Sequence, residues 1–114
     1  MENRMTMEQH DAQCPDILHV DKVSRLVFIY GRHVKMSAKL YRILLMLYEN
    51  MEQVVPSEEI YRDIFPDREM CQNLLSVYMY RLRKKLEQFG AENWVQSVHG
   101  VGYRLYFPFQ KTIG

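Results

Sequence analysis

The sequence predicts an α+β domain with a short antiparallel sheet, three helices and a C-terminal β-hairpin. Three observations carry this prediction. Short runs rich in β-branched and aromatic residues lie near the N-terminus, and apolar residues then recur at helical spacing in three segments. Near the C-terminus, two extended runs flank a pair of glycines. A chain of 114 residues has room for one domain with a modest core.

The first structured segment is expected to be an antiparallel meander of three strands. Extended runs at 17–20, 25–30 and 33–36 are separated by short polar or glycine-containing breaks. Residues 1–16 are polar and without periodicity, which predicts a disordered or flexible tail. We therefore expect a domain over residues 17–109, followed by a C-terminal tail at 110–114.

Two helices are predicted next. Ser37 is a suitable N-cap for a first helix, because apolar residues follow at helical spacing from Leu40 to Met51. A second helix is expected to open after Pro56, with Ser57 as its cap and two acidic residues in its first turn. The second helix ends at Phe65-Pro66 because proline disfavours helix before it.

A third helix is expected over residues 70–88 and carries the strongest functional signal. Its apolar stripe is worth about 1.5–3 kcal/mol per large buried side chain before entropy is counted; the stripe consists of Leu75, Tyr78, Met79, Leu82 and Leu86. The opposite face carries Asn73, Ser76, Val77, Tyr80 and Lys84, flanked by Arg81, Arg83 and Lys85, and so has several cations and no acid. This arrangement suggests a helix that binds nucleic acid. A solvated basic face that complements the dipole at the helix C-terminus is the alternative.

The last element is predicted to be a hairpin. Extended runs at 94–98 and 103–107 flank His99-Gly100-Val101-Gly102, where glycine makes positive φ or a close backbone approach inexpensive. Directly after a basic helix, such a hairpin is a candidate for a second nucleic-acid contact. A plain structural hairpin is the alternative.

Composition argues against several other classes of protein. The net charge of +1 means that any basic surface is local. Cys14 and Cys71 lie far apart without histidines at ligand spacing, so no metal site and no cofactor are expected. Scattered histidines and the lack of a nucleophile motif argue against an enzyme. The chain shows neither a signal peptide nor an apolar run of membrane-spanning length, so a soluble, cytoplasmic protein without membrane contact is expected.

This order of elements resembles the winged-helix effector domain of OmpR/PhoB-type response regulators, over about residues 24–107. The best matching stretches are Ser57–Ile60, Tyr80–Leu86 and Val95–Arg104. Arg-Leu-Arg-Lys-Lys-Leu alone is a weak signal, but Gly-Val-Gly-Tyr-Arg at this distance after it is specific. The resemblance implies a winged helix-turn-helix and a sequence-specific transcriptional regulator of a two-component system that binds double-stranded DNA.

In that family the third helix enters the major groove and the hairpin wing reaches the adjacent minor groove. The resemblance implies that Val77 contacts a thymine methyl group and that Arg81 pairs with guanine. Arg83 and Lys84 would hold phosphates. The DNA-binding residues implied in this way are Asn73, Ser76, Val77, Tyr80, Arg81, Arg83, Lys84, Ser97, His99 and Gly100.

The sequence departs from the family pattern at two positions. Asn73 and His99 stand where many members have arginine, so we expect weaker DNA binding than in a typical member. A protonated His99 would restore one of these charges. The chain offers no acidic phosphorylation pocket or alternating strand–helix pattern, so we expect either a fragment of a longer regulator or an effector that acts without its own receiver domain. A protein-interaction module that has lost or weakened DNA binding is the alternative function.

The resemblance also suggests protein partners. Residues 66–72 join the second and third helices, and in this family that loop can contact RNA polymerase. Asp67, Arg68 and Glu69 are therefore candidates for such contacts. Phe65 matches a family position near the DNA backbone, but a phenylalanine has no donor and is expected in the core. Family members sit as tandem copies on direct repeats, which suggests a homodimer on DNA.

Overall fold

A computed structural model describes residues 17–107. The predicted tails at 1–16 and 110–114 lie outside the described residues, as does Cys14. The described chain divides into two compact units, one ending at Lys35 and the other beginning at Met36. Each unit has its own three-stranded antiparallel sheet.

The first unit is the predicted meander. Its strands pair in the order β2-β3-β4, and they are β2 (Leu18–Asp21), β3 (Leu26–Ile29) and β4 (Arg32–His33). The third strand is shorter than predicted. Tyr30 and Gly31, between β3 and β4, have φ angles of 53° and 78°. Positive φ at both central positions is what a two-residue type I′ hairpin requires.

A carboxylate closes the turn between β2 and β3. Asp21 Oδ1 accepts hydrogen bonds from the backbone N–H groups of Val23 at 3.0 Å and Ser24 at 3.2 Å. These bonds favour the ionised carboxylate, first through Ser24 and then through Val23, and lower the pKa of Asp21. The turn is therefore stabilised most when Asp21 is charged.

The second unit contains the three predicted helices. They are α1 (Ala38–Glu49), α2 (Ser57–Ile64) and α3 (Gln72–Glu87). The Ser37 cap is confirmed, since its Oγ accepts the Leu40 N–H at 3.3 Å. The prediction that Ser57 caps α2 is wrong, because Pro56 occupies the cap position and makes no side-chain cap hydrogen bond. Ser57 is the first helical residue, and its N–H donates to the Val101 carbonyl at 3.1 Å.

The predicted hairpin is present and is part of a larger sheet. Its strands are β6 (Val95–Val98) and β7 (Gly102–Leu105), preceded by the 3-10 helix η2 (Glu92–Trp94). A strand that was not predicted to pair, β5 (Val55–Pro56), adds to β7 and gives the order β5-β7-β6. Pro56 lies opposite Gly102, and a Cβ on that glycine would collide with the Val55 carbonyl.

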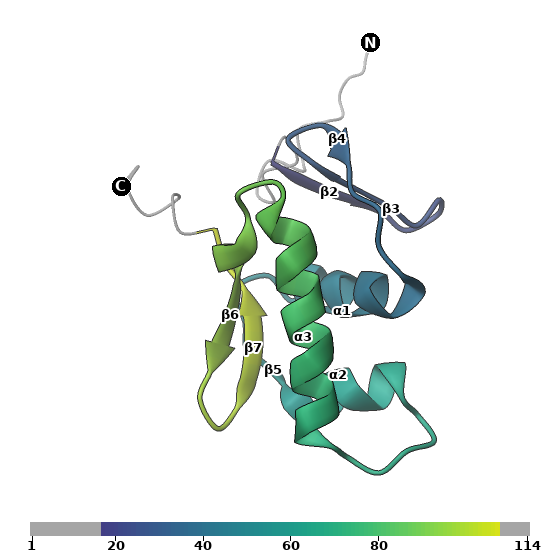
Figure 1. Ribbon diagram of the computed structural model, residues 1–114, viewed down its shortest axis with the longest axis vertical. Helices are drawn as coiled ribbons and strands as arrows, with labels where there is room; N and C mark the ends of the chain where they lie inside the picture. Colours follow the sequence, from purple (N-terminus) through teal and green to yellow (C-terminus); the bar gives the residue numbers. More distant parts are fainter. Residues whose placement is uncertain (1–16, 108–114) are drawn as a thin grey trace. The chain divides into compact units, whose positions relative to one another are not determined.

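The core of the second unit fixes the orientation of α3. Figure 1 shows α3 with the β6–β7 hairpin on one side and α1 and α2 on the other. The α3 side chains buried in this core are Leu75, Met79, Leu82 and Leu86. The predicted stripe is thus confirmed except at Tyr78, which is only half-buried. Arg42 and Asp63 join α1 to α2 through two hydrogen bonds of 3.0 Å and 2.9 Å.

Candidate nucleic-acid interface

The side of α3 that faces away from the core is open to solvent. Exposed side chains along it are Asn73, Ser76, Val77, Tyr80, Arg81 and Lys84. Val77 is 42% exposed and Tyr80 is 60% exposed, so this face presents an alkyl group and a phenol beside its polar and charged groups. Burial of the opposite stripe holds this face outward.

Arg83 lies at the side of α3 and contacts the hairpin. Its Nε–H donates to the Val95 carbonyl at 3.0 Å, and its Nη2 donates to Ser97 Oγ at 2.9 Å. Its guanidinium carbon lies 5.8 Å from the centre of the Tyr103 ring. The resemblance implied a phosphate contact for Arg83, whereas the structure uses its guanidinium to join α3 to β6. Ser97, another residue of the implied DNA-binding set, is one of its acceptors.

Two other cations of α3 also have intramolecular partners. Lys84 Nζ lies 2.9 Å from Glu87 Oε1 and 5.9 Å from the centre of the Tyr80 ring. The hydrogen bond and charge of Glu87 raise the pKa of Lys84. The Arg81 guanidinium carbon lies 5.2 Å from the centre of the Tyr78 ring. Both cations remain exposed, so both can still reach a polyanion.

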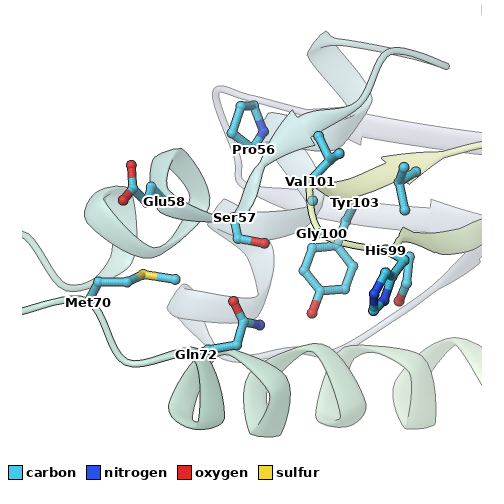
Figure 2. Close-up of a pocket in the computed structure, with 12 residues that line it drawn as sticks. Pro56, Ser57, Glu58, Met70, Gln72, His99, Gly100, Val101 and Tyr103 are labelled. Atoms are coloured by element: carbon cyan, nitrogen blue, oxygen red, sulfur yellow. The ribbon is translucent and has the colours of Figure 1, made fainter.

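A pocket of about 670 Å³ separates the hairpin turn from the first turns of α2 and α3. Figure 2 shows Tyr103 and His99 pointing from the hairpin toward α3, and Gln72 pointing from the start of α3 toward the hairpin. Ser57 and Glu58, at the start of α2, also line it. His99 and Gly100 are exposed, and Gly100 has a φ of 77° that suits glycine.

The loop between α2 and α3 exposes all three predicted polymerase-contact residues, Asp67, Arg68 and Glu69. The Arg68 guanidinium carbon lies 5.4 Å from the centre of the Phe65 ring. Phe65 is half-buried, and its ring contacts the rings of Tyr61 and Tyr78. Phe65 therefore packs against neighbouring rings at the edge of the core, and is less buried than expected.

Sequence reasoning missed the contact between Arg83 and the hairpin. At about 100° per residue, Arg83 lies beside the apolar stripe of α3 and not opposite it. That angle was a signal that its side chain points toward a neighbouring element. Which groups accept its hydrogen bonds, here those of Val95 and Ser97, depends on how the hairpin packs against α3. The spacing of residues in the sequence does not predict that packing.

Residues 17–107 contain neither a cluster of metal ligands nor a membrane-spanning helix. That part of the chain has no group of three or more histidine, cysteine or acidic side chains placed to hold a metal ion. Its helices are also too short or too polar to cross a membrane.

The model of the family described as "Transcriptional regulatory protein, C terminal" matches residues 31–105, which is more than half of the chain. The chain belongs to this family. Its fold is the winged helix-turn-helix of OmpR/PhoB-type response regulator effector domains, as the sequence predicted. The family is one of transcriptional regulators and not a family of enzymes.

Curated relatives include response regulators. The chain is 34% identical over 85 residues to the response regulator ArlR of Staphylococcus saprophyticus, and 32% identical to that of Staphylococcus epidermidis. Each match covers 74% of this chain and 39% of the relative. The matched stretch therefore spans well under half of the length of these relatives.

Solved structures share the fold. The DNA-binding domain of AdeR, in complex with an intercistronic region, has a TM-score of 0.72 at 22% identity and covers 79% of this chain and 94% of its own. The C-terminal domain of the nisin resistance regulator NsrR has a TM-score of 0.63 at 31% identity. The match covers 77% of this chain and 89% of the NsrR domain. The RstA DNA-binding domain of Klebsiella pneumoniae, in complex with the RstA box, has a TM-score of 0.66 at 24% identity. The match covers 78% of this chain and 90% of the RstA domain.

Proposed function

We propose that this winged helix binds double-stranded DNA sequence-specifically and regulates transcription, with α3 in the major groove and the β6–β7 hairpin in the adjacent minor groove. The observation that carries the proposal is the double hydrogen bond from Arg83, which ties the exposed helix to the hairpin. A major groove admits an α-helix, and a hairpin held beside that helix reaches the neighbouring groove.

Phosphates would supply most of the affinity in this arrangement. A DNA strand that separates the two grooves would pass over the pocket between the hairpin turn and α3. Gln72, Tyr103 and His99 line that pocket and offer hydrogen-bond donors. Lys84 would exchange Glu87 for a phosphate, and Arg81 would reach guanine from the flank of the helix.

The proposal is tested by selecting bound sequences from a random pool of duplexes, then titrating the selected site by fluorescence anisotropy. Arg81→Ala is expected to weaken binding by about 1–3 kcal/mol and relax preference at one base position. Lys84→Ala is expected to weaken all sequences alike. Arg62→Ala, an exposed change on α2, serves as the control. If neither Arg81→Ala nor Lys84→Ala alters binding to the selected site, the proposed docking is wrong.

Exposed Tyr80 favours a second candidate function, because tyrosine is enriched at protein interfaces. In that case the domain would be a protein-interaction module with weak or no DNA binding. Anisotropy titration of mixed-sequence duplex DNA at low salt separates the two, since only the proposed regulator binds it.

Two partners beyond DNA belong to the proposal. Asp67, Arg68 and Glu69 are exposed and would present a charged loop to RNA polymerase. A homodimer would form on DNA by binding of two copies to repeated half-sites. Both partners place the protein in the cytoplasm, where bacterial DNA and polymerase lie.

A further inference from the structure

A pocket of about 690 Å³ lies between the start of α1 and the C-terminal half of α3, both in the second unit. Its volume falls within the range of about 300–1,000 Å³ that small-molecule sites occupy. Ser37 and Leu40 line it from the side of α1, which packs against α3 (Figure 1). Its described lining residues differ from those of the pocket beside the hairpin turn. We call it the α1–α3 pocket.

Positive charge gathers along the α3 side of this pocket. Arg81, Lys84 and Lys85 line it, and of the side chains that the structure describes there, Glu87 is the only acid. Glu87 pairs with Lys84 at 2.9 Å, so within residues 17–107 neither Arg81 nor Lys85 has a carboxylate partner. The positive end of the α1 dipole adds to this charge, because the first turn of α1 contains no acidic residue. The α1–α3 pocket would therefore stabilise an anion.

Lys85 is the cation of this set that lies deepest in the protein surface. Its side chain is half-buried, whereas those of Arg81 and Lys84 are exposed. An ion pair at a partly buried site is screened less by water and salt than one at a fully exposed site. An anion beside Lys85 would therefore gain more than an anion beside either exposed neighbour.

The α1 side of the pocket offers apolar surface. Leu40 lines it and belongs to the core, with 5% of its surface exposed. Arginine and lysine side chains lay their methylene stems along apolar surface while their charged heads stay in water. A DNA phosphate would use the charges of this pocket but not its apolar wall, because sugar and phosphate are polar. A ligand that joins one anionic group to an aromatic or alkyl body would use both.

We propose that the α1–α3 pocket binds such a small amphiphilic anion, an aryl or alkyl carboxylate, sulfonate or phosphate ester, with its apolar body against Leu40. Lys85 would hold the anionic group together with Ser37, whose Oγ accepts the Leu40 N–H and whose O–H can still donate. Arg81 and Lys84 line this pocket and also belong to the proposed DNA interface, so ligand and DNA would exclude each other. That regulatory consequence rests on the proposed function, whereas binding of the ligand does not.

The probe for the test is 8-anilinonaphthalene-1-sulfonate (ANS), which has one sulfonate on an aromatic body and fluoresces strongly away from water. N-Phenyl-1-naphthylamine has the same body without the sulfonate, and inorganic sulfate has the charge without the body. Fluorescence titration of the full chain is expected to show saturable binding of ANS and about fivefold weaker binding of the amine. Inorganic sulfate at the same concentrations is not expected to displace ANS.

Substitutions of lysine test where the sulfonate binds. Lys85→Gln is expected to weaken ANS binding about fivefold, as loss of one partly exposed ion pair implies, and Lys85→Arg should restore most of it. Lys39→Gln is the matched control, because Lys39 is also half-buried but its ammonium lies over the Phe65 ring, outside the pocket. Amide chemical shifts of the unaltered protein locate the probe and should change most at Leu40 and Lys85.

Competition with DNA is measured by anisotropy of the selected duplex, labelled with a red dye whose emission does not overlap that of ANS. ANS at about ten times its dissociation constant is expected to weaken DNA binding by the unaltered protein about elevenfold, because the two ligands exclude each other. At the same ANS concentration, DNA binding by Lys85→Gln should weaken only about threefold relative to that variant without ANS. The amine should have little effect.

The outcomes separate this inference from the proposed function. Equal ANS binding by the unaltered protein and Lys85→Gln, equal losses in Lys85→Gln and Lys39→Gln, or chemical-shift changes confined to the pocket beside His99 overturn the ligand site while DNA binding stands. ANS bound at the α1–α3 pocket without any change in DNA affinity overturns the competition. A protein that binds ANS as expected and binds no duplex at low salt overturns the proposed function and leaves the ligand site standing.

Discussion

At the residue scale, Arg83 is the side chain whose role differs most between sequence and structure. Its two hydrogen bonds, to Val95 and Ser97, lead us to predict that it positions the hairpin, whereas the resemblance implied a phosphate ligand. A lysine at this position would keep the charge but could not donate from two nitrogens in a fixed geometry. The distinction can be measured, because phosphate ligands and positioning residues affect salt dependence differently.

We predict that Arg83→Lys weakens binding to the selected site without changing the slope of log K against log salt concentration. The loss comes from a misplaced hairpin, so it is expected to vanish on a duplex shortened to remove the minor-groove segment that the hairpin contacts. Lys84→Ala, on the same helix, should reduce the magnitude of the slope by about 1 on both duplexes. Anisotropy titrations over a range of KCl concentrations provide the measurement. A slope for Arg83→Lys changed as much as that for Lys84→Ala would make Arg83 a phosphate ligand.

At the element scale, much of the second unit follows from sequence patterns. The stripe of α3 is strictly periodic over Leu75 to Leu86, so both the helix and its buried side were predictable. The hairpin was predictable because glycines interrupt two β-rich runs. The pairing of β5 with β7 was not predictable. The two residues of β5 are too few to show a periodicity, and the strand they pair with lies almost fifty positions away. For the same reason, the sequence assigned Gly102 to the hairpin turn, whereas it stands in the sheet against β5.

The junction between β5 and β7 predicts a strong effect of one methyl group. Gly102→Ala places a Cβ against the Val55 carbonyl, which belongs to the backbone and cannot rotate away. We expect a loss of about 1–3 kcal/mol in the free energy of unfolding, as for overpacked sites. Gly100→Ala is the control, because a Cβ there would meet no neighbouring atom. Only the positive φ of Gly100 disfavours alanine, which should lower the free energy of unfolding by about 1 kcal/mol. Urea unfolding of both variants gives the comparison, and equal losses would argue against close packing at Gly102.

The β2–β3 turn of the first unit predicts a dependence of stability on pH. Because the folded pKa of Asp21 lies below its unfolded value, its contribution is present above the unfolded pKa and is lost as pH falls through the folded pKa. We expect Asp21→Asn to be less stable than the unaltered protein at neutral pH. The difference should shrink as the pH falls below the ordinary aspartate pKa of 3.8.

The control for this prediction is Ser24→Ala, which keeps the backbone N–H that donates to Asp21 and should keep most of the pH dependence. Urea unfolding at a series of pH values measures both variants. A difference between Asp21→Asn and the unaltered protein that stays constant across this range would show that the charge of Asp21 does not stabilise the turn.

At the scale of the whole molecule, a net charge of +1 must be reconciled with binding to a polyanion. The resemblance implied three phosphate or guanine contacts by cations of α3, namely Arg81, Arg83 and Lys84. The structure engages Arg83 elsewhere, which leaves Arg81, Lys84 and Lys85 as cations on or beside the proposed interface. Fewer counterions should therefore be released than in a strongly basic domain. Short-range contacts of exposed side chains on α3 would supply the remaining selectivity.

We predict a slope of log K against log salt concentration of about −2 to −3, since each neutralised phosphate contributes about −0.9 in B-form DNA. Lys84 and Lys85 on phosphates give the smaller magnitude, and a phosphate contact by Arg81 in place of guanine gives the larger one. Donors such as Gln72 at the pocket do not add to the slope because they carry no charge. Titrations of the selected duplex at several KCl concentrations measure the slope, and Arg62→Ala on α2 should leave it unchanged. Reduction of the slope by Arg62→Ala would place α2 on the phosphates and require a different docking. A slope near zero would mean that uncharged side chains such as Val77 and Tyr80, and not the cations of α3, supply the affinity, which is the behaviour of a protein-binding surface.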